Sequence, residues 1–261
     1  MIDAMRNYSE QPDAQIFTMH THDCYEIFCF LKGDARYYVE GTVYNLKPGD
    51  ILIMKKAEAH SLLLKSDAPY ERMVIYFTAD MLLGDFQSSM RSFLDDRPLG
   101  TDNRYRASNS WQTYLNKIVE SPDGEIKRLY LTVLLAELQA AKPQTKENRD
   151  HKDNLGALIT YLNENLAGDL SLETLCQRFY ISRSHLTERF KRLTGTTVSE
   201  YVRTKRLVMA KLLLQEGVRP TAAAEQCGFR EYSSFFYAYK KKYGRSPKEE
   251  RLSGVIVPPD R

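Results

Sequence analysis

Three histidines and one glutamate near the N-terminus have types and spacing that suit ligand binding: His20, His22, Glu26 and His60. Imidazole nitrogens and carboxylate oxygens suit divalent transition metals such as zinc, iron, nickel or manganese. The separations among His20, His22 and Glu26 are even, so these side chains are predicted to share one face of an unbroken strand. Without a metal, the four side chains could bond the hydroxyl or carboxylate groups of an organic ligand, or one another, and nearby rings such as Tyr37 would add stacking surface.

The charges of the chain point to a second kind of binding in its other half. Residues 1–147 hold 17 Lys and Arg against 21 Asp and Glu, whereas residues 148–261 hold 20 against 13. A basic half joined to a mildly acidic one indicates that one half meets a polyanion and the other does not. Charge alone does not distinguish a nucleic acid from an anionic membrane surface.

The N-terminal half must supply strands to hold the histidines. Short apolar runs separated by glycine and proline turns predict a small antiparallel barrel or sandwich, with strands at 25–31, 36–39, 51–54, 61–64 and 73–77. Helical spacing then predicts helices at 81–94, 111–119 and 125–141. The last of these has a broad apolar face, which either packs within the chain or is shared with a second subunit.

The C-terminal half is predicted to be helical throughout, after a polar linker at 144–153. A weak internal repeat relates two short helix-turn-helix units, in which Leu186 and Phe190 correspond to Phe235 and Tyr239. The helix at 199–215 joins the two units. Two helices and a tight turn on a basic surface form the layout that places its second helix in a DNA major groove. The predicted helices are 155–165, 172–179, 183–194, 199–215, 221–227 and 232–243.

Helix geometry assigns roles within the two units. With Leu186 and Phe190 facing the core, the side chains on another face of the same helix can contact base edges. The second helix of the other unit has an equivalent face. The residues predicted to contact bases are Ser184, Thr187, Glu188, Ser233, Phe236 and Tyr237. Cations suit phosphates, which position a protein without reading sequence. The residues predicted to contact phosphates are Arg183, Arg189, Lys191, Arg192, Lys240, Lys241 and Lys242.

The stretch from Leu170 to Arg251 resembles the AraC/XylS family of transcriptional regulators. The matching motifs are Leu186-Thr-Glu-Arg-Phe190-Lys, Thr194-Gly195, Glu200-Tyr201, Arg206-Leu-Val-Met-Ala210, Cys227-Gly228-Phe229, Ser233-Ser-Phe235 and Tyr243-Gly-Arg-Ser-Pro247. The resemblance implies two helix-turn-helix units on a rigid linking helix, which read successive major-groove turns. The family commonly has Arg where Glu188 and Tyr237 stand, and its usual Ile-Ala pair is Ala223-Ala224 here. These departures bear on base preference and leave the fold intact.

The N-terminal half resembles the cupin sensor domain often found in that family. His20, His22, Glu26 and Gly33 match the first cupin motif, while Pro48-Gly49-Asp50 and His60 resemble the second. In metal-dependent cupins, the three histidines and the glutamate would hold a divalent metal. Regulators of the family frequently retain such histidines without a metal, so an organic effector is favoured at His20, His22, Glu26, Tyr37 and His60. No cofactor is then required.

These observations predict an α+β protein. It has a cupin-like N-terminal β-barrel plus helices, followed by an all-α domain with two helix-turn-helix motifs. The predicted domains are an effector-sensing barrel (1–80), a helical dimerisation region (81–143), a linker (144–153), a DNA-binding domain (154–254) and a tail (255–261). The longest apolar stretches, 25–31 and 129–138, are shorter than the roughly 20 residues of a membrane span. The 4 scattered cysteines fit a reducing cytoplasm.

The leading hypothesis is a sequence-specific, DNA-binding transcriptional regulator controlled by a small-molecule effector, and not an enzyme. Its expected partners are double-stranded DNA, the effector, a second copy of the chain and, for an activator, RNA polymerase. One alternative is a metal-dependent cupin enzyme or metal sensor fused to a DNA-binding module. A constitutive architectural DNA binder is a third possibility, which predicts no effector.

Overall fold

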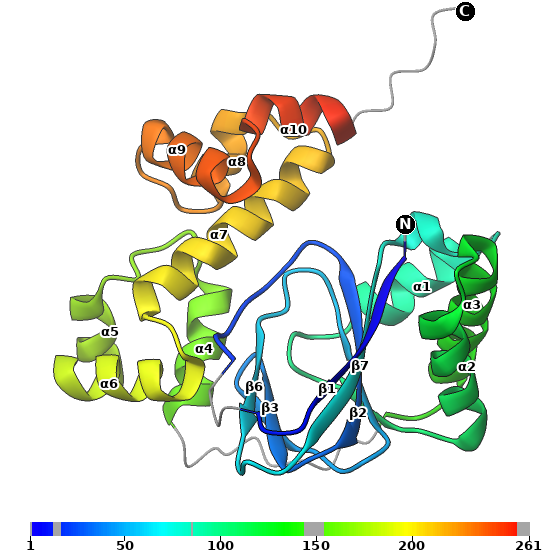
Figure 1. Cartoon of the computed structure of the whole chain (residues 1–261). Helices are drawn as coiled ribbons and strands as arrows, with labels where there is room; N and C mark the ends of the chain where they lie inside the picture. Colours follow the sequence, from blue (N-terminus) through cyan, green and yellow to red (C-terminus); the bar gives the residue numbers. More distant parts are fainter. Residues whose placement is uncertain (1, 13–16, 85, 144–153, 255–261) are drawn as a thin grey trace, which may run out of the picture. The chain divides into compact units, whose positions relative to one another are not determined.

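The computed structural model describes residues 2–12, 17–84, 86–143 and 154–254. It divides into two compact units, Met1–Gly156 and Ala157–Arg261, and each is described by itself (Figure 1). The predicted linker at 144–153 and the predicted tail at 255–261 lie outside the described residues.

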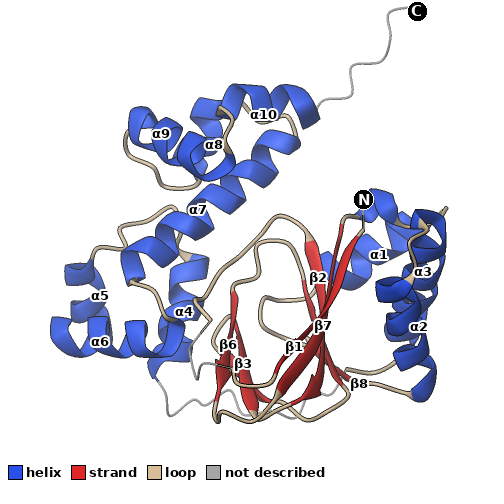
Figure 2. Cartoon of the chain, viewed as in Figure 1, coloured by secondary structure: helices blue, strands red, loops and turns tan. Residues whose placement is uncertain are grey.

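Two antiparallel sheets form the first unit (Figure 2). One has five strands in the order β1-β7-β2-β5-β8, and the other has three in the order β4-β3-β6. In the described part of the chain these sheets are not hydrogen-bonded into one closed barrel. Of the predicted barrel or sandwich, the structure has a cupin-like sandwich of two layers. The strands are β1 Asp3–Ser9, β2 Tyr25–Lys32, β3 Ala35–Val39, β4 Thr42–Asn45, β5 Asp50–Met54, β6 His60–Leu64, β7 Tyr70–Phe77 and β8 Arg104–Arg106.

Strand β2 shows how alternation builds two cores from one strand. Tyr25, Ile27 and Cys29 belong to the apolar core on the helix-covered face of the larger sheet. Phe28 and Phe30 belong to the core between the two sheets. Because successive side chains of a strand point to opposite faces, both sets are buried. Glu26 shares the inner face with the two phenylalanines, which places a carboxylate inside an apolar sandwich.

Helices cover the outer face of the larger sheet: α1 Phe86–Asp95, α2 Asn109–Glu120 and α3 Gly124–Ala140. The helix predicted at 81–94 is instead split into a short 3₁₀ turn, η1 Ala79–Met81, and α1. Gly84, with φ +55, lies in the break. Strands β1, β4 and β8 were not predicted. Strand β8 comes from the 81–143 segment, which was assigned to helices alone.

The broad apolar face of α3 is divided between two environments. Leu131, Leu134, Leu135 and Leu138 are buried in the core beneath α2 and α3. Ile126 and Leu129, one turn earlier, are 42% and 49% exposed. Part of the face therefore packs within the chain, while its N-terminal part remains on the surface of this unit.

A buried carboxylate fixes the loop that precedes β6 and its first residue, His60. Glu58 is fully buried and accepts hydrogen bonds from both Arg97 terminal nitrogens, at 2.9 and 2.6 Å. It also accepts from Asn103 Nδ2 and from the backbone nitrogens of Gly100 and Lys55, at 2.8 to 2.9 Å. One side chain thus ties this loop to the segment between α1 and β8.

The second unit consists of helices. They are α4 Asn154–Glu164, α5 Leu172–Phe179, α6 Arg183–Thr194, α7 Val198–Gln215, α8 Pro220–Gln226, α9 Tyr232–Tyr243 and α10 Pro247–Gly254. Side-chain caps start four of them, because Ser171, Ser182, Thr197 and Ser246 accept hydrogen bonds from backbone nitrogens of the first turn. None of the helices in the described part of the chain combines the length and apolar character that a membrane span requires.

Candidate functional site

The first helix-turn-helix motif is α5, a tight turn and α6. Tyr180 ends α5 in the left-handed conformation, with φ 52, and Ser182 then caps α6 by accepting from the His185 nitrogen. Leu186 and Phe190 are buried at 2% and 0% exposure. Burial of that stripe leaves the opposite side of α6 free to meet a partner.

The second motif is α8, a turn through Gly228 and α9. Gly228 has φ +80, a conformation that favours glycine. Phe235 and Tyr239 are fully buried, and the Phe235 ring lies 5.1 Å from that of Phe229. The two motifs therefore share one internal design, as the repeat predicted.

The residues predicted to contact bases lie on or near the outer stripes. Ser184, Glu188, Ser233 and Tyr237 are exposed, whereas Thr187 and Phe236 are half-buried. Thr187 Oγ1 already bonds the carbonyls of Arg183 and Ser184, at 2.9 and 3.1 Å. Its hydroxyl proton is thus engaged within the helix, so its methyl group and oxygen lone pairs are what it can offer a base.

The residues predicted to contact phosphates form the basic surface of the same two helices. Arg189 is half-buried; the exposed members are Arg183, Lys191, Arg192, Lys240, Lys241 and Lys242. Exposed cations on the flanks of two reading helices suit a polyanion.

Two residues without a predicted role hold the motifs together. Arg206 on α7 donates from Nε to the Leu166 carbonyl at 2.8 Å and from Nη2 to the Gly168 carbonyl at 2.9 Å. A Cβ at Gly228 would lie 2.5 Å from the Leu166 carbonyl oxygen. The turn of the second motif therefore packs directly on the loop that leads into the first. The sequence signal was the Cys227-Gly228-Phe229 motif, but its packing partner is distant in the chain.

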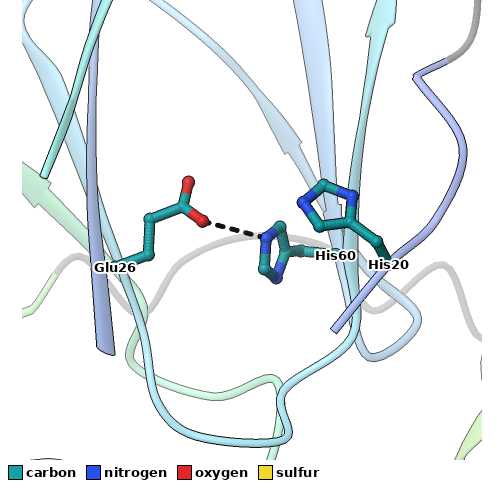
Figure 3. Close-up of side chains that lie close together, drawn as sticks. All are labelled: His20, Glu26 and His60. Atoms are coloured by element: carbon teal, nitrogen blue, oxygen red, sulfur yellow. Dashed lines mark ion pairs between the residues drawn. The ribbon is translucent and has the colours of Figure 1, made fainter. Parts of the chain in front are cut away.

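A histidine cluster, defined as His20, His22, Glu26 and His60, lies at one end of the inner face of the first unit. Glu26 Oε2 is 2.9 Å from His22 Nε2. It is also 3.1 Å from His60 Nε2, as Figure 3 shows. The rings of His20 and His60 are 4.4 Å apart. Tyr37 donates its hydroxyl to Glu26 Oε1 at 3.4 Å. His60 is fully buried and His20 is exposed, so the cluster reaches the surface of the unit through His20.

Two family models match the chain. An AraC-like ligand binding domain matches residues 5–111, and a helix-turn-helix domain matches residues 175–253. The chain belongs to the AraC family of transcriptional regulators. Its AraC-like ligand-binding domain contains the histidine cluster, and its helix-turn-helix domain contains both motifs. The predicted fold class and family are confirmed.

Individual relatives of this AraC-family chain agree with the assignment. The HTH-type transcriptional activator RhaR of an Enterobacter species is 26% identical over 249 residues, which cover 90% of this chain and 87% of RhaR. RhaR of Cronobacter sakazakii is 24% identical, covering 89% and 86%. Among solved structures, ToxT from Vibrio cholerae O395 aligns over 98% of this chain and 99% of its own, with 16% identity and a TM-score of 0.41. The RhaR relatives are transcriptional regulators, which are not enzymes.

The strand that was predicted to carry the cluster is interrupted in this AraC-family structure. Strand β2 begins at Tyr25, after a bend at Asp23 and Cys24. His20 instead forms an isolated bridge with His60. The prediction of one unbroken strand was therefore wrong, because residues at even separations share a face only while the chain stays extended. Even so, the bend brings together His20, His22, Glu26, Tyr37 and His60, the five residues predicted to bind an effector.

The environment separates the protonation states of the cluster. Although the His20 residue is exposed overall, desolvation of its ring and the nearby His60 imidazole lower the pKa of His20 to about 4. Burial would also lower the pKa of His22, but hydrogen bonds to Cys24 and Glu26 outweigh it and raise that pKa to about 10. Burial would raise the pKa of Glu26, whereas His60 and His22 hold it well below its usual range. Near neutral pH the cluster therefore offers a neutral imidazole, an imidazolium and a carboxylate.

The same geometry has a donor set that fits a metal. One ligand atom each from His20, Glu26 and His60 lies within 4.8 Å of the others. Two imidazoles and a carboxylate suit zinc, iron, nickel or manganese. His60 Nε2 is buried and makes no hydrogen bond of good geometry, despite its 3.1 Å approach to Glu26. The fourth predicted ligand, His22, pairs with Glu26 and lies outside this group of three.

Proposed function

We propose that a small polar effector binds at the histidine cluster and changes the affinity of the helix-turn-helix domain for DNA. This proposal rests on a group of buried titratable side chains, Glu26, His60 and Tyr37, on the inner face of an apolar sandwich. Such convergent polar groups orient ligands in apolar sites. A typical coupling of about 1–3 kcal/mol would change DNA affinity by roughly 5–150-fold.

In the DNA-bound state, α6 and α9 enter successive major grooves with the base and phosphate contacts predicted from the sequence. Since the RhaR relatives are named transcriptional activators, the regulator engages RNA polymerase. It does so in the cytoplasm, without any enzymatic step.

The exposed Ile126 and Leu129 on α3 support a homodimer. A monomer found by sedimentation at DNA-binding concentrations would contradict the homodimer.

A comparison of Glu26→Gln with Glu71→Gln tests the effector site. Candidate metabolites are screened for a thermal shift, because a ligand that binds only the folded state raises its stability. Binding of a hit to the chain and to its selected DNA is then measured. We expect Glu26→Gln to lose the shift and the change in DNA affinity, while Glu71→Gln, whose carboxylate pairs with Arg6 at 2.8 Å, retains both. A hit that binds without changing DNA affinity would refute the switch.

A divalent transition metal held by His20, Glu26 and His60 is the second candidate. It would supply a Lewis acid with open positions for a ligand or water. Metal analysis of the purified protein and titration with Zn²⁺ distinguish the two candidates. Stoichiometric metal that is lost in His60→Ala supports a metal sensor, whereas no Zn²⁺ binding ends this candidate. A screen in which neither metal nor metabolite stabilises the chain would favour a constitutive DNA binder.

Substitutions on α6 and α9 test the assignment of DNA contacts. Glu188→Ala is expected to change base preference at one position, because a carboxylate accepts from the cytosine amino group and alanine does not. Lys241→Ala is expected to weaken all duplexes similarly and to lower the salt slope by about one. Selection from a random duplex library with each variant measures both effects. Unchanged base preference in Glu188→Ala and Thr187→Ala would show that α6 is turned differently on DNA.

A further inference from the structure

An open groove lies within the second unit, between the start of α5 and helix α9. Its volume is about 870 Å³. Residues 167–171 form one wall, and the α8–α9 turn with Ser234, Tyr237 and Lys241 forms the other. The first half of α7, with Ser199, Arg203 and Arg206, lines it between these walls. In Figure 1, helix α5 of the first motif and helix α9 of the second lie on the same side of α7.

The groove has an excess of positive charge. Four cations line it, Arg203, Arg206, Arg230 and Lys241, against the two acids Asp169 and Glu231. The side chains of Arg203 and Arg230 are 62% and 86% exposed. Their ion pairs are long, at 3.8 Å from Arg203 to Glu200 and 3.7 Å from Arg230 to Asp169. Such exposed ion pairs contribute little to stability, so a phosphate group can replace the carboxylates as the partner of these arginines.

The face of α9 toward the groove shares only Tyr237 with the stripe predicted to contact bases. Ser234, Tyr237, Ala238 and Lys241 line the groove, at helical spacing. Ser234 was not among the predicted contacts, and Ser233 does not line the groove. Hydroxyl groups and cations in one row are the groups that most often bond phosphate and sugar oxygens.

We propose that this groove binds the DNA phosphodiester backbone that runs between the two major-groove segments entered by α6 and α9. The inference rests on the proposed DNA-binding mode. Two helices that enter successive turns leave one stretch of backbone facing the protein between them. The groove offers that stretch guanidinium groups from Arg203 and Arg230, an ammonium group from Lys241 and hydroxyl groups from Ser199 and Ser234.

Salt titrations of the full chain test the site, with Arg203→Ala and Arg230→Ala measured separately. The probes are the duplex selected best by the wild type and a random-sequence duplex of about 30 base pairs. We expect each variant to lose about three- to tenfold in affinity on both probes and to lower the salt slope by about one, because one phosphate contact disappears. The matched control is Lys248→Ala, an exposed cation on α10 outside the groove, which should keep the wild-type slope.

A change of opposite sign sharpens the test. Glu231 lines the groove beside Arg230, and its side chain makes no capping hydrogen bond to α9. Glu231→Gln is therefore expected to raise affinity several-fold on both probes, whereas Glu216→Gln at the end of α7 leaves it unchanged. Neutral methylphosphonates at the centre of the selected duplex should weaken binding of the wild type more than that of Arg230→Ala.

The outcomes separate this inference from the proposed function. If the wild type binds no duplex, the DNA-binding mode itself is wrong. If it binds with a steep salt dependence that Arg203→Ala and Arg230→Ala both retain, the chain reads DNA but the groove does not hold its backbone. Misfolding is checked by far-UV circular dichroism of each variant.

Discussion

Gly228→Ala is expected to abolish high-affinity DNA binding although the substitution adds a single methyl group. The added Cβ would lie 2.5 Å from the Leu166 carbonyl oxygen, 2.8 Å from Ala167 Cα and 2.9 Å from Arg206 Nη2. Two of these neighbours are backbone, so the turn of the second motif must move away from the loop that leads into the first. The φ of +80 adds conformational strain. The expected destabilisation of this unit is about 2–4 kcal/mol.

Gly244→Ala is the matched control. Gly244 has nearly the same φ, +73, but a Cβ there would meet nothing within 4 Å. It should cost only the strain of a left-handed alanine, about 1 kcal/mol, and retain DNA binding. Thermal unfolding by circular dichroism and affinity for the selected duplex measure both effects. Equal losses in the two variants would show that backbone strain, rather than contact between the motifs, explains the requirement for glycine.

Glu58→Ala is expected to destabilise the ligand-binding unit by about 3–5 kcal/mol. The substitution removes the buried partner of the Arg97 guanidinium, at 2.6 Å, and leaves that cation without a carboxylate. It also leaves the Gly100 nitrogen without its acceptor and removes one of the two acceptors of Asn103 Nδ2, which keeps only the Ile53 carbonyl at 2.8 Å. A buried donor left without an acceptor lowers the free energy of unfolding by more than the hydrogen bond itself contributes to it.

The chain provides its own reporter for this experiment. Its single tryptophan, Trp111, packs in the core of the same unit. Denaturant titration followed by tryptophan fluorescence therefore reports the unfolding of the unit that contains Glu58. Glu71→Ala, which breaks the more exposed pair with Arg6, should cost less than about 1 kcal/mol. A similar midpoint for both variants would mean that water or rearrangement compensates the loss of Glu58.

Helix ends were predictable because their signals are local. Ser171, Ser182 and Gly195 mark boundaries within a few residues of sequence, and the structure has α5, α6 and α9 at the predicted bounds. Strand β8 was not predictable in this way. Its three residues pair with β5, some fifty positions earlier in the chain, and no alternation is visible in so short a run.

The histidine cluster was located by residue type although its backbone was predicted incorrectly. Ligand chemistry restricts which side chains can gather, so His20, Glu26 and His60 were identifiable before their geometry was known. The bend at Asp23 was not identifiable, because residues 20–25 contain no glycine or proline to mark it. The groove between α5 and α9 could not be predicted for a related reason, since Arg203 and Arg230 become neighbours only through tertiary packing.

Helix α7 has a consequence for the operator. It is 18 residues long, about 27 Å at the usual rise, and Arg206 on it anchors the loop before α5 while Gly228 packs on that loop. In the proposed binding mode, the two recognition helices held by this helix keep a constant spacing. Because B-form DNA turns once in about 10.5 base pairs, each base pair inserted between the half-sites rotates one of them away from its reader by roughly 34°. In that mode, DNA affinity is expected to depend on the helical phase between the half-sites as well as on their bases.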